Sequence, residues 1–289
     1  MATVFVFNNV GGGDWNTSAN WTPNGVPAAG DTAQITSGGT YTVSTTQNET
    51  IAILETAKSV TLAIGSHTTF DVTSGTGPGA NAGAITVANG ATIELGGTFL
   101  NSGSIALNAT TSNTALQVDG AALTLSGTGT VALTDNSLNA IATNGAPVLS
   151  NAANTISGAG TIGNGGLTLF NGGKIIGNGA ANELILNLDN GFNSGTLEGT
   201  TAQGLLISAF EFDQTANGVV LASGAGARVH IGDTTVISGG TVKTVGAGAA
   251  VDVAAGAVGC RRCCRQAWHW SPTRHRSWRR RRRSAACRR

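Results

Sequence analysis

The sequence predicts an all-β protein built as a parallel β-solenoid, a rod of stacked coils made of short strands. Three observations support this fold class: the composition, the alternation of apolar and polar residues, and a motif that recurs at intervals of 22 residues or about twice that. Gly accounts for 43 of 289 residues and charged residues for only 11%. Because Gly, Asn and Thr are poor in helix interiors, this composition favours short strands joined by tight turns.

Short segments of strict alternation run from about residue 41 to residue 259. Examples are Phe70-Asp71-Val72, Ile93-Glu94-Leu95 and Val229-His230-Ile231. Alternate side chains of a strand point to opposite faces, so Val, Ile and Leu are expected inside and the polar residues outside. Pairs such as Asn89-Gly90 lie between these segments and predict turns. Residues 41–259 are therefore expected to form the β-solenoid.

An Asn-x-Gly-x-Ile/Leu motif marks the expected coils. It occurs in Asn101–Ile105, Asn171–Ile175 and Asn193–Leu197, each soon after a Phe, and Ser238–Val242 repeats its shape without the Phe. The last three starts are separated by 22 and 45 residues, about one and two turns of a coil. Periods of 20–50 residues are typical of solenoids, and about ten coils are expected here.

The first 40 residues differ from the rest and are expected to form an N-terminal cap (1–40). They contain Trp15 and Trp21, the only tryptophans before residue 260, together with Phe5 and Phe7. The end of a solenoid exposes both a sheet edge and its core, so it needs a cover. Large aromatic side chains at one terminus suit that role.

An antiparallel β-sandwich is the alternative architecture. Its hairpins would need turns every 8–12 residues, which the Asn-Gly pairs could supply. The recurring Asn-x-Gly-x-Ile motif favours the solenoid, because a sandwich does not require such repeats.

The N-terminal segment also carries a motif, Trp15-x4-Asn20-Trp21-x3-Gly25-x-Pro27-x3-Asp31-x-Ala33-x-Ile35. It resembles the opening of bacterial autotransporter-type and large adhesin-type β-repeat proteins, and the coils resemble their passenger domains. The resemblance extends over about residues 1–259. It implies a right-handed β-helix that is secreted or displayed on a surface, often with an adhesive role. It supplies no catalytic residues, and Trp15, Asn20, Trp21, Gly25, Pro27 and Asp31 are expected to be structural residues of the cap.

The net charge of +1 hides an uneven distribution. Residues 1–259 contain 4 Lys and Arg against 15 Asp and Glu, a balance of −11, whereas residues 260–289 contain 12 Arg and no acid. All four cysteines also lie in this last segment. Residues 260–289 are expected to be a disordered basic tail.

The abrupt change of composition after Gly259 suggests that this tail is translated out of frame. Gly, frequent before this point, does not occur after it, and three of the five Trp do. Arg codons of the CGN type, shifted by one base, become codons for Gly, Ala, Val, Asp or Glu. The shifted frame would thus restore the composition of the solenoid. Two other hypotheses for the tail, a zinc site at Cys260, Cys263 and Cys264 with His269 and His275 and nucleic-acid binding by Arg279–Arg283, are weaker.

Catalysis would require clustered carboxylates, as in pectin-degrading β-helix enzymes. The acidic residues Asp71, Glu94, Asp119, Asp189, Asp213 and Asp252 are mostly spread one per strand, which indicates a solvated outer face. Stacking could nevertheless align some of them. His67 and His230 lack an Asp-His-Ser context and are expected on the surface. Gly158–Gly163 approximates a nucleotide-binding pattern, with Glu183 at about the right spacing, but a strand-like segment follows it instead of a helix.

The expected function is a non-enzymatic, secreted or cell-surface β-solenoid of adhesin or autotransporter-passenger type, a fragment of a longer protein. The alternative is a carbohydrate-active β-helix, a polysaccharide lyase or hydrolase. Expected partners are host-surface or extracellular-matrix glycans or proteins, with no nucleic acid, no cofactor and no metal. The sequence start lacks the features of a signal peptide, and no apolar run of about 18 residues predicts a transmembrane helix.

Overall fold

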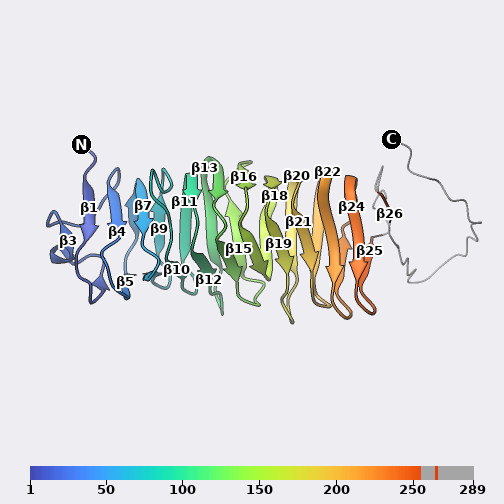
Figure 1. Ribbon diagram of the computed structural model, residues 1–289, viewed down its shortest axis with the longest axis horizontal. Helices are drawn as coiled ribbons and strands as arrows, with labels where there is room; N and C mark the ends of the chain where they lie inside the picture. The colour runs from blue at the N-terminus through green and yellow to red at the C-terminus, as the bar shows by residue number, and fades with distance from the viewer. Residues whose placement is uncertain (255–263, 266–289) are drawn as a thin grey trace, which may run out of the picture.

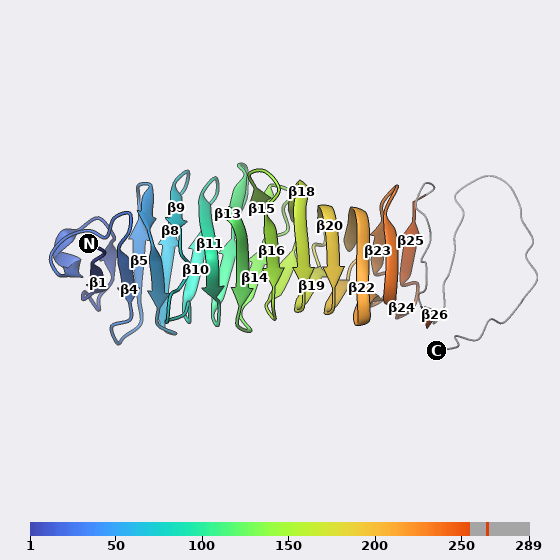
Figure 2. The same cartoon turned by 90° about the horizontal axis from the view of Figure 1, so that it is seen from above.

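The computed structural model describes residues 1–254 and 264–265, which form an elongated rod of about ten stacked coils. The strands follow one another along the rod in chain order, with β1 near one end and β25 near the other (Figure 1). Figure 2 shows the same order from above. Apart from Cys264–Arg265, which form the short strand β26, the expected basic tail and its cysteine and arginine motifs lie outside the described residues.

Each complete coil has three strand segments, and each lies on one of three lateral faces. Face 1 contains the strands β5 (Tyr41–Thr45), β8 (Val60–Ile64), β10 (Ala84–Val87), β12 (Ser104–Leu107), β14 (Thr130–Leu133), β17 (Thr155–Gly158), β19 (Lys174–Gly177) and β21 (Thr196–Gly199). Face 2 contains β6 (Glu49–Ile51), β9 (Thr69–Val72), β15 (Asn139–Thr143), β23 (Arg228–Ile231) and β25 (Ala250–Val253).

Several strands continue round a corner from one face to the next. Face 2 and face 3 share β11 (Thr92–Leu100), β13 (Thr114–Ser126), β18 (Gly160–Asn171) and β20 (Leu184–Asn193). Face 3 also contains β7 (Ile53–Thr56) and β16 (Val148–Asn151). The strand β22 (Leu205–Ser223) crosses faces 2, 3 and 1, and β24 (Val236–Val245) crosses faces 3 and 1.

The strand pairing is parallel throughout the stack. The strands β1 (Val4–Phe7) and β3 (Trp21–Thr22) form the only antiparallel pair among the described residues. Nine steps of the face 1 register lead from Thr42 to Thr241, so a coil averages about 22 residues. The all-β parallel solenoid is thus confirmed, and the sandwich alternative is wrong because it requires antiparallel hairpins.

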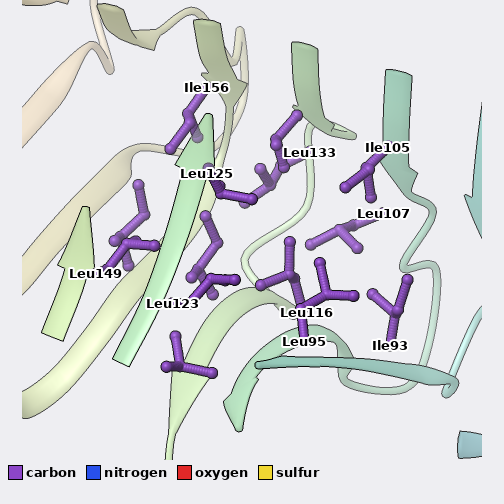
Figure 3. Close-up of a cluster of buried hydrophobic side chains, with 14 of the residues drawn as sticks. Ile93, Leu95, Ile105, Leu107, Leu116, Leu123, Leu125, Leu133, Leu149 and Ile156 are labelled. Atoms are coloured by element: carbon purple, nitrogen blue, oxygen red, sulfur yellow. The ribbon is translucent and has the colours of Figure 1, made fainter. Parts of the chain in front are cut away.

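The core is a set of aliphatic columns that run along the rod. The motif Ile/Leu residues form one column, in which Ile85, Ile105, Val131, Ile156, Ile175, Leu197, Val220 and Val242 follow one another in register. All are buried. Figure 3 shows Ile105 and Leu107 gathered with side chains from faces 2 and 3, including Ile93, Leu116 and Leu123. Each coil buries its apolar side chains against the coils on either side, so the stack forms one continuous core.

The motif Asn residues form a second buried column at the corner between face 3 and face 1. Asn81 Nδ2 donates to Asn101 Oδ1 at 2.7 Å, and Asn171 Nδ2 donates to Asn193 Oδ1 at 2.9 Å. Between these pairs, Asn154 and Asn151 continue the column, and Gln214 extends it beyond Asn193. These amides satisfy one another inside the rod, where an unpaired polar group would be costly.

The motif Gly allows each coil to approach its neighbour closely at this corner. A Cβ at Gly195 would lie 2.0 Å from the carbonyl oxygen of Gly173, and one at Gly103 would lie 1.9 Å from that of Gly83. Only Gly fits at such a distance. In the Asn-x-Gly-x-Ile motif, the Asn therefore supplies a buried amide, the Gly permits a close backbone contact, and the Ile is a core residue.

Candidate functional site

The N-terminal segment contains a buried aromatic cluster that packs against the solenoid. The segment consists of β1, β2 (Gly13–Asp14), the 3₁₀ helix η1 (Ser18–Asn20), β3 and β4 (Thr32–Ile35). Trp15 and Trp21 are almost fully buried, as expected, with ring centroids 4.7 Å apart in an edge-to-face arrangement. Trp15 also contacts Phe70 of β9, at 5.0 Å, so it joins this segment to the coils.

The other expected cap residues hold the chain around this cluster. Asn20 is buried and donates from Nδ2 to the carbonyl oxygen of Asp14. Asp31 accepts hydrogen bonds from the backbone N–H groups of Thr3 and Ala28. Gly25 lies beside the ring of Phe5, since a Cβ there would be 3.0 Å from it, and Pro27 is buried. All six residues lie within the N-terminal segment, and their capping role remains a prediction.

Stacking brings three of the six acidic residues together at the corner of faces 2 and 3. Asp71 of β9 is in register with Glu94 of β11. Asp119 follows in the next coil, where its Oδ2 would lie 3.3 Å from a Cβ on Gly96. We call these three residues the carboxylate corner. The sequence left their alignment open, because coil lengths vary and the register cannot be deduced from spacing alone.

The pKa values of two carboxyl groups in the carboxylate corner, Asp71 and Glu94, are raised. Burial raises the pKa of Asp71, and the nearby charge of Asp119 raises it further. Burial also raises the pKa of Glu94, with added contributions from Asp71 and Asp119. The Oδ1 atom of Asp71 is buried and has no hydrogen-bond partner among the described residues. Carboxyl groups whose pKa is raised by burial and by neighbouring carboxylates are the type of group that general acid catalysis uses.

The remaining expected carboxylates lie elsewhere. Asp189 is on β20, near the corner of faces 2 and 3, and Asp213 is on β22, on face 3. Asp252 is on β25, on face 2. Among the described residues, no group of three or more His, Cys, Asp and Glu side chains is arranged to hold a metal ion.

His230 belongs to a charged cluster on face 2. Its Nδ1 contacts Glu183 Oε1 across an intervening coil, and its Nε2 lies 3.7 Å from Asp252 Oδ2. Arg228 completes the cluster through a 2.9 Å ion pair with Asp252. The bond to Glu183 raises the pKa of His230, and the charges of Glu183 and Asp252 act in the same direction, although burial and Arg228 oppose them. The contact joins residues 47 apart, and no sequence spacing indicated it.

His67 and the Gly158–Gly163 segment have local structural roles. The His67 imidazole lies over Gly90 of the next coil, where a Cβ would be 2.7 Å from its ring. Gly158 and Gly160 end β17 and begin β18, with only Ala159 between them. A strand thus follows the glycines, as the sequence predicted, and a phosphate-binding helix N-terminus is missing from this described segment.

Face 1 carries an open groove near its corner with face 2, and its lining surface is more apolar than polar. Its volume is about 580 Å³, and it extends over four coils. Apolar side chains such as Ile64 and Ala88 line it together with the hydroxyl and amide groups of Ser44, Asn89 and Asn108. Asn89 itself holds the neighbouring loop, because its Oδ1 accepts from the N–H groups of Thr110, Thr111 and Ser112.

Face 3 carries an exposed aromatic pair that the sequence analysis associated only with the motif. Phe170 and Phe192 are in register on β18 and β20, and their rings stack with centroids 4.7 Å apart and planes 9° apart. They are 43% and 39% exposed, whereas Phe99, near the first motif copy, is fully buried. Phe99 lies two residues before the motif Asn, whereas Phe170 and Phe192 lie one residue before it. Phe99 therefore faces the opposite side of the strand from Phe170 and Phe192.

No helix among the described residues is long and apolar enough to cross a membrane. Comparison of the chain with protein-family models, with curated proteins and with solved structures finds no match in any of the three.

Proposed function

We propose that this chain is a non-enzymatic, secreted or cell-surface β-solenoid of adhesin or autotransporter-passenger type. The observation that carries the proposal is the uninterrupted stack of about ten coils, which offers long, flat lateral faces. Such faces suit partners that extend over several coils, as repeat proteins commonly bind them. The aromatic pair on face 3 and the groove on face 1 are the two surfaces that we propose for binding.

Composition and motif also support this proposal. The first 259 residues contain no Cys, so disulfides and thiolate metal sites play no part in them. Their N-terminal motif resembles that of surface-displayed β-repeat proteins. The partners we propose are glycans or proteins of a host surface or extracellular matrix, and the location is extracellular or on the bacterial cell surface.

A binding experiment tests this function. The full chain, immobilised, is probed with an array of host-type glycans and with purified matrix proteins. Saturable binding that survives moderate salt supports the proposal. A matched sample unfolded in urea should lose that binding. Absence of binding to every glycan and protein at micromolar concentration would contradict it.

A carbohydrate-active enzyme is the second candidate, and the carboxylate corner is the observation that favours it. Asp71 and Glu94 lie side by side, and a carboxyl group with a raised pKa suits the role of general acid. The test is turnover on a panel of polysaccharides by the unmodified chain and by Asp71→Asn and Glu94→Gln. Turnover that both substitutions abolish would replace the non-enzymatic proposal by this one.

A further inference from the structure

Face 3 carries a surface patch in which exposed aromatic rings adjoin carboxylates. Phe170 and Phe192 stack along the rod, and Phe210, at the corner beside them, is 75% exposed. Among the Phe, Trp and Tyr side chains of the described residues, only these three are exposed. We call them, together with Asp189, Glu211 and Asp213, the aromatic–acidic patch.

The register shows how the acidic side chains continue the aromatic column. Phe170, Phe192 and Asp213 occupy the same position in three successive coils, on β18, β20 and β22. Thr168, Asn190 and Glu211 form the neighbouring position in the same coils. Successive coils are about 4.8 Å apart, so Asp213 lies one rung beyond Phe192.

This arrangement leaves one face of the Phe192 ring without an aromatic neighbour. The other face stacks on Phe170. An Asp side chain is shorter than a Phe side chain, so the Asp213 carboxylate lies below the level of the ring. A planar cation placed on this face of the Phe192 ring would stack on the ring and contact the Asp213 carboxylate.

The charges at this position select a cation. Glu211 and Asp213 are two residues apart on one strand, so their side chains emerge on the same side about 6–7 Å apart. Neither has an ion pair or hydrogen bond among the described residues, whereas Glu183, Glu198 and Asp252 are paired. Asp189 occupies the same corner position as Phe210, one coil earlier, and adds a third negative charge. Residues 1–259 carry a balance of −11, which attracts cations to the rod as a whole.

We infer that the aromatic–acidic patch binds an arginine-bearing polypeptide segment, with one guanidinium stacked on Phe192 and paired with Asp213 and Glu211. Guanidinium is planar, stacks on aromatic rings and bonds to carboxylates in a fixed fork, whereas the Lys ammonium is a point charge that does not stack. The inference rests on the proposed function, because it treats a lateral face as a binding surface, and it names the partner chemistry of that face.

The test compares three peptides of equal length that alternate Gly with Arg, Lys or Glu. Their binding to the full chain is measured by isothermal titration calorimetry at physiological salt. The Arg peptide should bind about tenfold more tightly than the Lys peptide, and the Glu peptide should not bind. Equal affinity for the Arg and Lys peptides would overturn the inference, because general attraction to an acidic rod does not distinguish them.

Substitutions locate the binding. Phe192→Thr, which matches the Ser and Thr residues of the same column, should weaken Arg-peptide binding about tenfold, and so should Glu211→Gln with Asp213→Asn. The matched control is Glu55→Gln with Asp135→Asn, which removes the same charge away from the patch and should leave binding within twofold. Equal losses from both double substitutions would overturn the inference. Thermal unfolding checks that each variant is folded, and Phe170→Thr is a second aromatic variant should Phe192→Thr be unstable.

A neutral oligosaccharide is the competing ligand for exposed aromatic rings. Binding of such a sugar that depends on Phe192, without binding of the Arg peptide, would overturn the inference and still support the proposed function. Arg-peptide binding by a chain that binds no glycan or matrix protein would support the patch and contradict the adhesive role.

Discussion

Asn171 donates a hydrogen bond from Nδ2 to Oδ1 of Asn193 at 2.9 Å, and both side chains are buried inside the rod. The same Asn171 accepts from Asn151 Nδ2 at 2.8 Å. Replacing Asn171 with Leu should leave a donor and an acceptor without their partner and lower the free energy of unfolding by about 2–4 kcal/mol. Urea denaturation measures this. Asn187→Ala, on the outward side of β20, is the control and should cost less than about 1 kcal/mol.

The glycine of the motif supplies a second prediction. Gly195→Ala places a Cβ 2.0 Å from the carbonyl oxygen of Gly173, so two coils must separate locally. We expect a loss of about 3 kcal/mol or more, measured by thermal unfolding. Gly38→Ala is the matched control, because a Cβ there meets nothing within 4 Å. Equal stability of the two variants would show that the coils are not in close contact at this corner.

The repeating coil is predictable from the sequence, but not every copy of the Asn-x-Gly-x-Ile motif is recognised there. Asn81-Ala-Gly-Ala-Ile85 matches the motif fully and takes its expected place in the amide column, yet no Phe precedes it to draw attention. Ser238 shows the opposite error. It begins a motif-like segment, but it pairs with Asp213 on the outer side, and Gly239 occupies the column position beside Gln214. The loop before this segment shifts the motif by one residue relative to the preceding coil. A shift of one residue turns a side chain from the inner to the outer face of the strand.

The candidate surfaces were harder to predict, because they depend on register between coils. Coils range from 19 residues, between Thr42 and Thr61, to 26, between Ser104 and Thr130. The meeting of Asp71 with Glu94, or of Glu183 with His230, follows from these lengths and from which loops bulge outward. A single sequence shows that such residues face outward, and only the stacked coils show which of them are neighbours.

The N-terminal aromatic cluster should be essential to the stability of the first coils. Trp15→Ala should lower the free energy of unfolding by about 3–5 kcal/mol, because it removes contacts with Trp21 and with Phe70 of the solenoid. If the segment also acts as a cap, the double variant with Trp21→Ala should expose a sheet edge and associate end to end. Light scattering after size-exclusion chromatography measures this. Val10→Ala, at an exposed position, is the control. A monomeric double variant with unchanged melting would contradict the capping role.

The carboxylate corner should make the rod more stable in mild acid. The pKa of Glu94 is higher in the folded chain than in an unfolded one, because burial, Asp71 and Asp119 disfavour its charge. The favourable contribution is therefore present below the unfolded pKa, near 4.3, and is lost as pH rises through the folded pKa. Glu94→Gln removes this loss, so its melting temperature should exceed that of the unmodified chain by about 2 °C at pH 7 and match it near pH 3. Calorimetry at both pH values measures the difference, and an equal offset at both would contradict the titration.

The His230 cluster should give a pH dependence at higher pH. The bond to Glu183 raises the pKa of His230 above its usual value near 6.5, with Asp252 acting in the same direction and Arg228 against it. A raised pKa means that the folded chain holds the proton more tightly than the unfolded chain does. The stabilisation is thus fully present below pH 6.5 and is lost as pH rises through the folded pKa. His230→Gln keeps a polar side chain but cannot carry the charge, so it should lower the melting temperature at pH 6 and have little effect at pH 9. His67→Gln, at the chain's other described histidine, is measured in parallel as the control. Melting curves from pH 5 to 9 measure both variants, and a His230→Gln effect that is constant over this range would show that the contact with Glu183 does not depend on the imidazolium charge.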